Sequence, residues 1–153
     1  MSDRLEDTTF KLILSSTKGA TGWPDVEVLF GDEIIYRGII EDVLEIEKTI
    51  QVPEGLVSFR VDLLNHSYKD VVLNNEDDTE IQNKTITIDL IELEGIDVTN
   101  IAYSNGTYHV TEDGYPYHKD QPLVRKKEVS LVWNGHWQFE VECPVYIWLL
   151  ENL

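Results

Sequence analysis

The chain has 153 residues, of which 42% are hydrophobic and 27% charged, a composition typical of a folded domain rather than a disordered segment. Twelve basic residues against 29 acidic ones give a net charge of −17, which repels nucleic-acid phosphates and anionic lipids. No apolar stretch approaches the roughly 18 residues of a membrane span, and the polar, acidic N-terminus does not resemble a secretory signal. We therefore expect one domain over residues 1–153, with neither nucleic acid nor membrane as a partner.

Alternation of apolar and polar side chains predicts half-buried strands along much of the chain. In the clearest example, residues 56–64, apolar side chains from Val57 to Leu63 alternate with Ser58, Arg60 and Asp62. The other predicted strands of the first 95 residues are 8–16, 25–30, 33–40, 43–50 and 84–93, the last with Ile86, Ile88 and Leu90 facing inward.

Three dipeptides predict tight hairpin turns between such strands. These are Gly31-Asp32, Asn105-Gly106 and Asn134-Gly135, each flanked by alternating segments. Residues 145–151 are predicted as the last strand, because no window of the chain shows a convincing helical period. About ten strands with short connections predict an all-β fold, a jelly-roll β-sandwich of antiparallel strands.

Signatures of enzymes are sparse. The chain lacks a GxSxG elbow, a Walker A loop, a GxGxxG fingerprint and an HExxH helix. The four histidines are scattered over different segments, which does not indicate a shared metal site. Among 29 acidic residues some pair of carboxylates will always suit a glycosidase, so this signal has almost no specificity. The single cysteine, Cys143, excludes an intrachain disulfide and is expected as a buried small hydrophobe. We therefore predict a protein without enzymatic activity.

The stretch 65–83 carries the strongest chemical signal. It lies between two apolar strands and combines acidic side chains with asparagines, a supply of hard oxygen ligands that suits calcium. Its spacing does not match an EF-hand. The competing interpretation is a solvated acidic loop, because charge runs on loops are usually only soluble surface.

Two groups of motifs precede and follow this acidic loop. The first is Gly22 and Pro24 before an alternating stretch that closes in glycine. The second is a strand that ends at Asn65, the acidic loop itself, and a strand that starts at Asn83 and closes in Gly95. In this order the motifs resemble those of calcium-dependent xylan-binding carbohydrate-binding modules.

The resemblance covers residues 9–95 and implies a jelly roll that grips a sugar through a calcium ion held on loops. On this chain it implies calcium ligands at Glu27, Asp70, Asp77 and Asp78. Residues 96–153 fall outside this core and are expected to add further strands.

The chain departs from the family pattern at two candidate calcium positions. His66 stands where the family often has aspartate, and Asn83 stands where its aspartate is usual, so both positions have lost a charge. These departures favour a second hypothesis, an architectural protein that keeps the fold without binding sugar.

Exposed aromatic side chains are the other candidate sugar contacts, because large rigid rings pack well on the apolar faces of sugars. Trp23 lies beside a turn proline, and Tyr115 and Tyr117 lie in a polar, glycine-containing stretch. The other tryptophans, Trp133, Trp137 and Trp148, are expected in the core or in an interface.

The C-terminal segment 131–153 is similar to small virion proteins of tailed bacteriophages that carry such domains. The sequence thus predicts a non-enzymatic structural or decorating protein of a phage virion, made in the host cytoplasm, with calcium-assisted adhesion to a glycan. Its expected partners are other virion subunits, further copies of itself, and a polysaccharide. The alternative is a purely architectural subunit of the capsid, neck or tail with no sugar binding.

Overall fold

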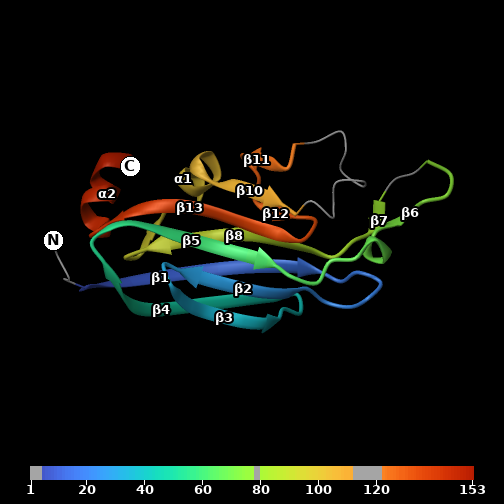
Figure 1. Cartoon of the computed structure of the whole chain (residues 1–153), viewed down its shortest axis with the longest axis horizontal. Coiled ribbons are helices and arrows are strands. Elements are labelled where there is room, and N and C mark those ends of the chain that lie inside the picture. The colour runs from blue at the N-terminus through green and yellow to red at the C-terminus, as the bar shows by residue number, and fades with distance from the viewer. Residues whose placement is uncertain (1–4, 78–79, 112–121) are drawn as a thin grey trace.

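The alternating segments pair into two antiparallel sheets that face each other across an apolar core, as in a jelly-roll β-sandwich (Figure 1). The computed structural model describes residues 5–77, 80–111 and 122–153. The strands are β1 (Leu5–Thr17), β2 (Asp25–Phe30), β3 (Glu33–Ile39), β4 (Val43–Pro53), β5 (Gly55–Leu63), β6 (Val72–Leu73), β7 (Glu80–Gln82), β8 (Thr85–Leu93), β9 (Ile96–Asp97), β10 (Thr107–Val110), β11 (Val124–Lys126), β12 (Ser130–Leu131) and β13 (Gly135–Cys143). The helices are the 3-10 helix η1 (Tyr68–Asp70) and the α-helices α1 (Thr99–Asn105) and α2 (Val145–Asn152).

One sheet has the strand order β12-β8-β1-β4, with β9 paired to β8, and the other has the order β11-β10-β13-β5-β2-β3. The short strands β6 and β7 pair with each other outside both sheets, at the end of the sandwich opposite α2 (Figure 1). The chain thus has a helical end, where β1 begins, and a loop end, where β1 and β5 finish.

Four phenylalanines join the two sheets across the core. Phe10 of β1 stacks on Phe30 of β2 with ring centroids 5.7 Å apart, and Phe59 of β5 meets Phe30 edge-on at 5.8 Å. Phe139 of β13 extends the cluster, 5.9 Å from Phe59. All four side chains are buried, and each such aromatic pair contributes roughly 0.5–1.5 kcal/mol beyond its area burial.

The predicted strand at 84–93 is confirmed, but its inward face changes along its length. Ile86 and Ile88 are buried as predicted, whereas Leu90 is half-buried and Ile91 and Leu93 take the core positions. The pairing with β1 shifts register between Ile88 and Leu90, which leaves one extra residue in β8. A bulge of this kind reverses the parity of every later side chain, so the alternation predicts the wrong face beyond it.

Of the three predicted hairpins, only the one at Gly31-Asp32 is confirmed in the described residues; there Phe30 pairs with Glu33 and Gly31 adopts a positive φ of 62°. The prediction at Asn105-Gly106 is wrong, because these residues end α1 and the Gly106 N–H donates to the carbonyl of Ala102. Gly106 is needed for packing, since a Cβ there would overlap the ring of Trp137.

The prediction of a hairpin at Asn134-Gly135 is also wrong. β12 pairs with β8 in one sheet, whereas β13 pairs with β5 and β10 in the other. The dipeptide therefore carries the chain from one sheet to the other instead of reversing it within a sheet.

The predicted last strand is a helix. α2 follows Pro144, and its buried residues, Val145, Trp148 and Leu149, have the three- and four-residue spacing of one helix face. They pack beside the end of β13, where Trp148 approaches Phe139 with ring centroids 6.4 Å apart. The helical period is hidden in the sequence because the outward face is also apolar.

Several burial predictions are confirmed. Trp133, Trp137 and Trp148 are all buried, and Cys143 is a buried free thiol whose burial raises its pKa to about 11. Within the described ranges, no helix is long and apolar enough to cross a membrane.

The helical assignment of α2 can be tested with three neighbouring positions. Trp148→Ala and Leu149→Ala should each lower the free energy of unfolding by about 2–5 kcal/mol, because both side chains are buried. Leu150→Ala should change it by less than about 0.5 kcal/mol, since that side chain is 83% exposed. Urea unfolding measures all three. In a strand, the side chains of residues 148 and 149 would point to opposite faces, and one of them would be exposed. If either Trp148→Ala or Leu149→Ala left the free energy of unfolding unchanged, the helix would be contradicted.

Candidate functional site

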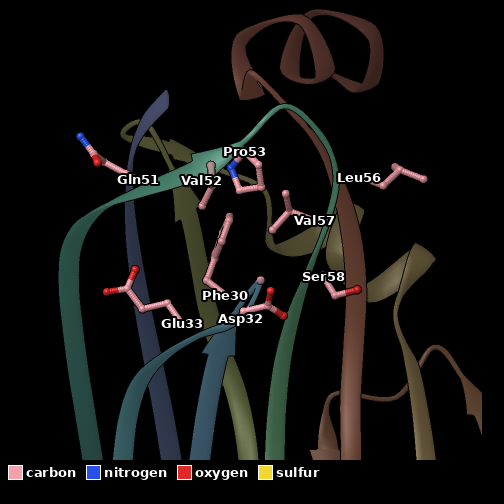
Figure 2. A pocket seen from close by; sticks show the side chains of 10 residues that line it. Phe30, Asp32, Glu33, Gln51, Val52, Pro53, Leu56, Val57 and Ser58 are labelled. Atoms are coloured by element: carbon pink, nitrogen blue, oxygen red, sulfur yellow. The ribbon is translucent and has the colours of Figure 1, made fainter. Parts of the chain in front are cut away.

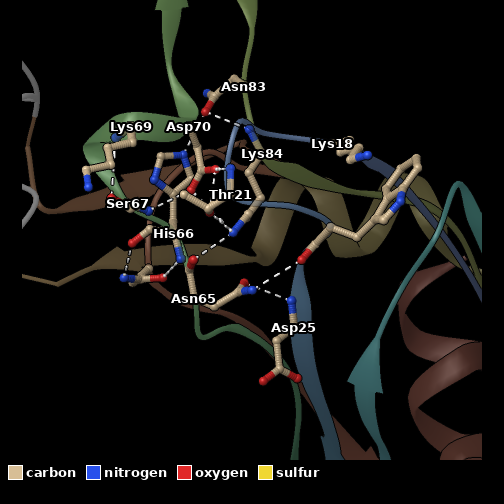
Figure 3. Close-up of polar contacts among 12 residues, drawn as sticks. Lys18, Thr21, Asp25, Asn65, His66, Ser67, Lys69, Asp70, Asn83 and Lys84 are labelled. Carbon is tan, nitrogen blue, oxygen red and sulfur yellow. Dashed lines mark hydrogen bonds and ion pairs between the residues drawn. The ribbon is translucent and has the colours of Figure 1, made fainter.

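Four segments far apart in the sequence meet at the loop end of the sandwich (Figure 3). They are the β1–β2 loop (18–24), the connection after β5 (64–70), residues 83–84 before β8, and Asn134 before β13. Side-chain hydrogen bonds join these segments where strand pairing has ended.

A buried ion pair lies at the centre of this end. The side chains of Asp70 and Lys84 are 0% and 1% exposed, and Lys84 Nζ lies 3.3 Å from Asp70 Oδ2. Asp70 Oδ1 accepts hydrogen bonds from the backbone N–H of Thr21 at 2.8 Å and from its hydroxyl at 2.7 Å. Asp70 Oδ2 also accepts from the Ser67 N–H at 2.9 Å. Lys84 Nζ in turn donates to Thr21 Oγ1 at 2.8 Å and to the Asn65 carbonyl at 2.9 Å.

The ionised form of Asp70 is favoured despite its burial. Burial by itself raises the pKa of a carboxyl, but the hydrogen bonds from Thr21, Ser67 and Lys84 outweigh it and lower the pKa of Asp70 below its ordinary value. Gly19 lies so close that any Cβ there would overlap this carboxylate. The loop is therefore built around Asp70.

Two asparagines hold loop backbone at this end much as a strand partner would. Asn65 accepts from the Asp25 N–H at 2.8 Å through Oδ1 and donates through Nδ2 to the Trp23 carbonyl at 3.2 Å. Asn134 accepts from the His66 N–H at 2.6 Å and donates to the His66 carbonyl at 2.9 Å. Both amides satisfy backbone groups that the sheets leave without a strand neighbour.

The two positions where the chain departs from the family pattern bond to each other. His66 Nε2 lies 2.7 Å from Asn83 Oδ1, and that oxygen also accepts from the Lys84 N–H at 2.8 Å. Since Oδ1 accepts, His66 is the donor and carries its proton on Nε2. Both side chains are buried, so this pair is part of the packed loop end.

The four residues implied as calcium ligands lie in different surroundings. Glu27 lies on the outward face of β2, with Oε2 3.8 Å from Arg37 Nη1, and Asp77 is exposed. Asp70 is held by the ion pair, and Asp78 lies outside the described residues. Over the part of the chain that the structure describes, no three His, Cys, Asp or Glu side chains form a group that could hold a metal.

The loop end does not fit a calcium ion at Asp70. A carboxylate has about four lone-pair sites, and those of Asp70 receive two donors from Thr21, one from Ser67 and the ammonium of Lys84. A divalent ion would have to displace these donors and approach the positive charge of Lys84.

The predicted sugar-stacking residues are placed only in part. Trp23 is half-buried in the β1–β2 loop, and its carbonyl is held by Asn65. Tyr115 and Tyr117 lie outside the described residues.

The outward face of the six-stranded sheet carries a row of polar side chains that crosses five strands. By strand register, the row runs through Arg37, Glu27, Asp62, His136 and His109. The rings of His109 and His136 stack with centroids 4.6 Å apart.

Arg60, the neighbouring outward-facing residue of β5, forms a bidentate ion pair with Asp62. Arg60 Nε and Nη2 lie 2.7 Å and 3.1 Å from the two carboxylate oxygens of Asp62. The pKa of His136 is lowered by burial, by the positive charge of Arg60 and by the neighbouring His109 ring, so its imidazole is neutral at pH 7. Arg60, Asp62 and neutral His136 therefore present hydrogen-bond donors and acceptors with no net charge.

A groove of about 470 Å³ opens beside these groups, next to the loop end. Its lining includes Arg60, Asp62, His136, Asn134 and the 39% exposed Leu64. Fixed polar groups around an apolar patch are the usual lining of small-molecule sites. The uncharged balance suits a neutral, hydroxyl-rich ligand.

A second hollow, of about 550 Å³, lies at the helical end between the β2–β3 turn and the β4–β5 connection (Figure 2). Phe30, Val52 and Val57 line its inner part, and Asp32 and Glu33 contribute two carboxylates. This hollow is acidic and apolar, whereas the groove beside Arg60 offers paired donors and acceptors.

No protein-family model matches this chain, and no curated protein matches it in sequence. Among solved structures, vCBM60 in complex with galactobiose is similar, with a TM-score of 0.54 and 13% identity over 87% of this chain and 99% of that chain. The selenomethionine form of vCBM60 has the same TM-score and identity over 86% of this chain and 89% of that chain. It is described as linking two families of calcium-dependent carbohydrate-binding modules by circular permutation. At this identity the likeness establishes a shared fold.

Sequence reasoning missed Lys84 as a member of the buried loop end. The signal was present, because Lys84 has the same parity as Ile86 and Ile88, which face the core. Extending the alternation one step back puts the lysine inside, and a buried lysine requires a counter-ion.

Asp70 should make the free energy of unfolding depend on pH in a recognisable way. Asp70→Asn should lower the free energy of unfolding by about 3–5 kcal/mol at pH 7, because it leaves Lys84 buried without a counter-ion. The lowered pKa means that this contribution is fully present above the ordinary value of 3.8 and is lost progressively as the pH falls from there through the lower pKa of folded Asp70. Urea unfolding of both proteins from pH 3 to 7 measures the difference.

The exposed variant Asp32→Asn controls for the loss of one negative charge. A gap between wild type and Asp70→Asn that is as large at pH 3 as at pH 7 would contradict an ionised Asp70.

Proposed function

We propose that this protein is a non-enzymatic carbohydrate-binding-module-like adhesion protein that serves as a structural or decorating subunit of a bacteriophage virion. The sandwich has the fold of modules of which one is solved with galactobiose. The virion assignment is a proposal from the sequence alone, namely the resemblance noted above between residues 131–153 and small virion proteins of tailed phages. The shared fold agrees with the motif order of residues 9–95.

The groove beside Arg60 is the observation that carries the sugar-binding part of the proposal. A sugar hydroxyl both donates and accepts hydrogen bonds, and Arg60, Asp62 and His136 supply both kinds of partner from positions on β5 and β13. The mutual ion pair fixes Arg60 and Asp62 before a ligand arrives, which reduces the ordering cost of binding. Leu64 offers an apolar surface for the C–H face of a sugar ring.

The proposed ligand is a neutral oligosaccharide. The net charge of −17 disfavours acidic glycans, and the groove itself carries no excess charge to recruit them. The binding role assigned to these residues requires no calcium ion.

Sugar binding can be tested with galactobiose and xylo-oligosaccharides as probes. Calorimetric titration of the full chain should detect binding of at least one of them, and Arg60→Ala and His136→Ala should each weaken it roughly tenfold or more. Lys11→Ala, which removes a lysine paired with Glu45 on the other sheet, is the matched control and should bind as wild type does.

The proposal fails if neither probe binds, or if binding survives both groove variants unchanged. Circular dichroism of each variant separates loss of binding from loss of fold.

A second candidate function, a purely architectural subunit, is favoured by the outward face of α2. Tyr146, Ile147, Leu150 and Leu153 are 56–83% exposed and lie together on this short helix and the residue after it. Exposed apolar patches of this kind mark contact surfaces on many soluble proteins. In this function the helix would dock on another copy or another virion subunit.

The architectural function predicts self-association that depends on α2. Ile147→Ser with Leu150→Ser should leave the melting temperature nearly unchanged, because both side chains are exposed, and should convert oligomers to monomers in analytical ultracentrifugation. A wild-type protein that is monomeric and binds sugar would support adhesion alone. The buried neighbour Leu149 is left intact in this variant.

A further inference from the structure

We infer that the ammonium group of Lys84 is the resident cation of the loop end, so that this chain holds its loops together without a calcium ion. Solved modules of the same fold are described as calcium-dependent. The inference goes beyond the proposed function and does not rest on it, because it concerns how the loops are held and not what they bind.

The contacts of Lys84 are those of a small cation site. An ammonium has three protons, and Nζ has three oxygen neighbours: Thr21 Oγ1 at 2.8 Å, the Asn65 carbonyl at 2.9 Å and Asp70 Oδ2 at 3.3 Å. The oxygens come from two segments: Thr21 lies in the β1–β2 loop, and Asn65 and Asp70 lie in the connection after β5. With Lys84 itself preceding β8, one charge ties three segments together (Figure 3).

The charge balance of this site fits a monovalent cation. Lys84 supplies one positive charge and Asp70 one negative charge, both almost completely buried, so the pair is neutral as a unit. A calcium ion beside Asp70 alone would leave an excess positive charge in a poorly hydrated place, which is strongly unfavourable.

The donors around Asp70 are arranged for an ammonium partner as well. Three of its four lone-pair sites accept N–H or O–H groups from Thr21 and Ser67, which leaves one oxygen direction for Lys84. The Thr21 hydroxyl donates to Asp70 and accepts from Lys84, so its single proton orders the network. His66 and Asn83 complete the surroundings by bonding to each other through side chains.

Thermal unfolding of the full wild-type chain tests the inference directly. In EDTA and in millimolar calcium chloride the melting temperature should agree within about 1 °C. A site saturated at one hundred times its Kd would instead raise it by roughly 5–10 °C. A rise of that size would overturn the inference.

Lys84→Met tests the role of the charge, since it keeps a long apolar side chain and removes the ammonium. The melting temperature should fall on the order of ten degrees, because Asp70 is left buried without a counter-ion. Lys69→Met, which removes an exposed ammonium from η1, is the matched control and should change it by less than about 2 °C. Equal stability of the two variants would overturn the inference.

A double variant keeps the test decisive if Lys84→Met folds poorly. Adding Asp70→Asn removes the unpaired charge, so the double variant should melt higher than Lys84→Met alone. A double variant that melts no higher would show that Lys84 does not act through its charge. Sugar binding enters none of these measurements, so a negative sugar titration leaves this inference intact.

Discussion

Each sheet of this protein buries one face, and that constraint decides the side of every side chain along a strand. In β5 it sends Phe59 to the core and Arg60 and Asp62 to the outward face. Just before β8 the same parity carries Lys84 inward, on the side of Ile86. A charged group inside the sandwich must find a counter-ion, and the loop end is organised around the carboxylate that supplies it.

The polar groups of the molecule therefore have two different fates. At the loop end, Asp70, Lys84 and the asparagines beside them satisfy one another, and their hydrogen-bonding capacity is used in holding the loops. On the outward face of the six-stranded sheet, Arg60 and Asp62 are also paired, but they line an open groove. The outward face of the six-stranded sheet is therefore better suited to bind a ligand than the loop end, where few donors or acceptors are left for one.

The proposal for Lys84 separates the fold of this protein from the calcium dependence described for similar modules. The sandwich is similar to modules described as calcium-dependent, yet the position beside Asp70 is filled by an ammonium group from its own chain. The buried Lys84 joins the loops through its hydrogen bonds to Thr21 and Asn65, and a chelator cannot remove it. The side chains of His66 and Asn83 pair with each other beside this lysine.

The sequence by itself determined the all-β class, most of the strands up to residue 93 and their core faces, because period-two alternation is a local property. It did not determine α2, whose two faces are both apolar, or the reversal of parity at the bulge after Ile88. The partners of Asp70 were also decided only by the tertiary structure. Lys84 and Thr21 are distant in sequence from Asp70, and only the folding of the sheets brings the three together in a buried place where their charges must balance.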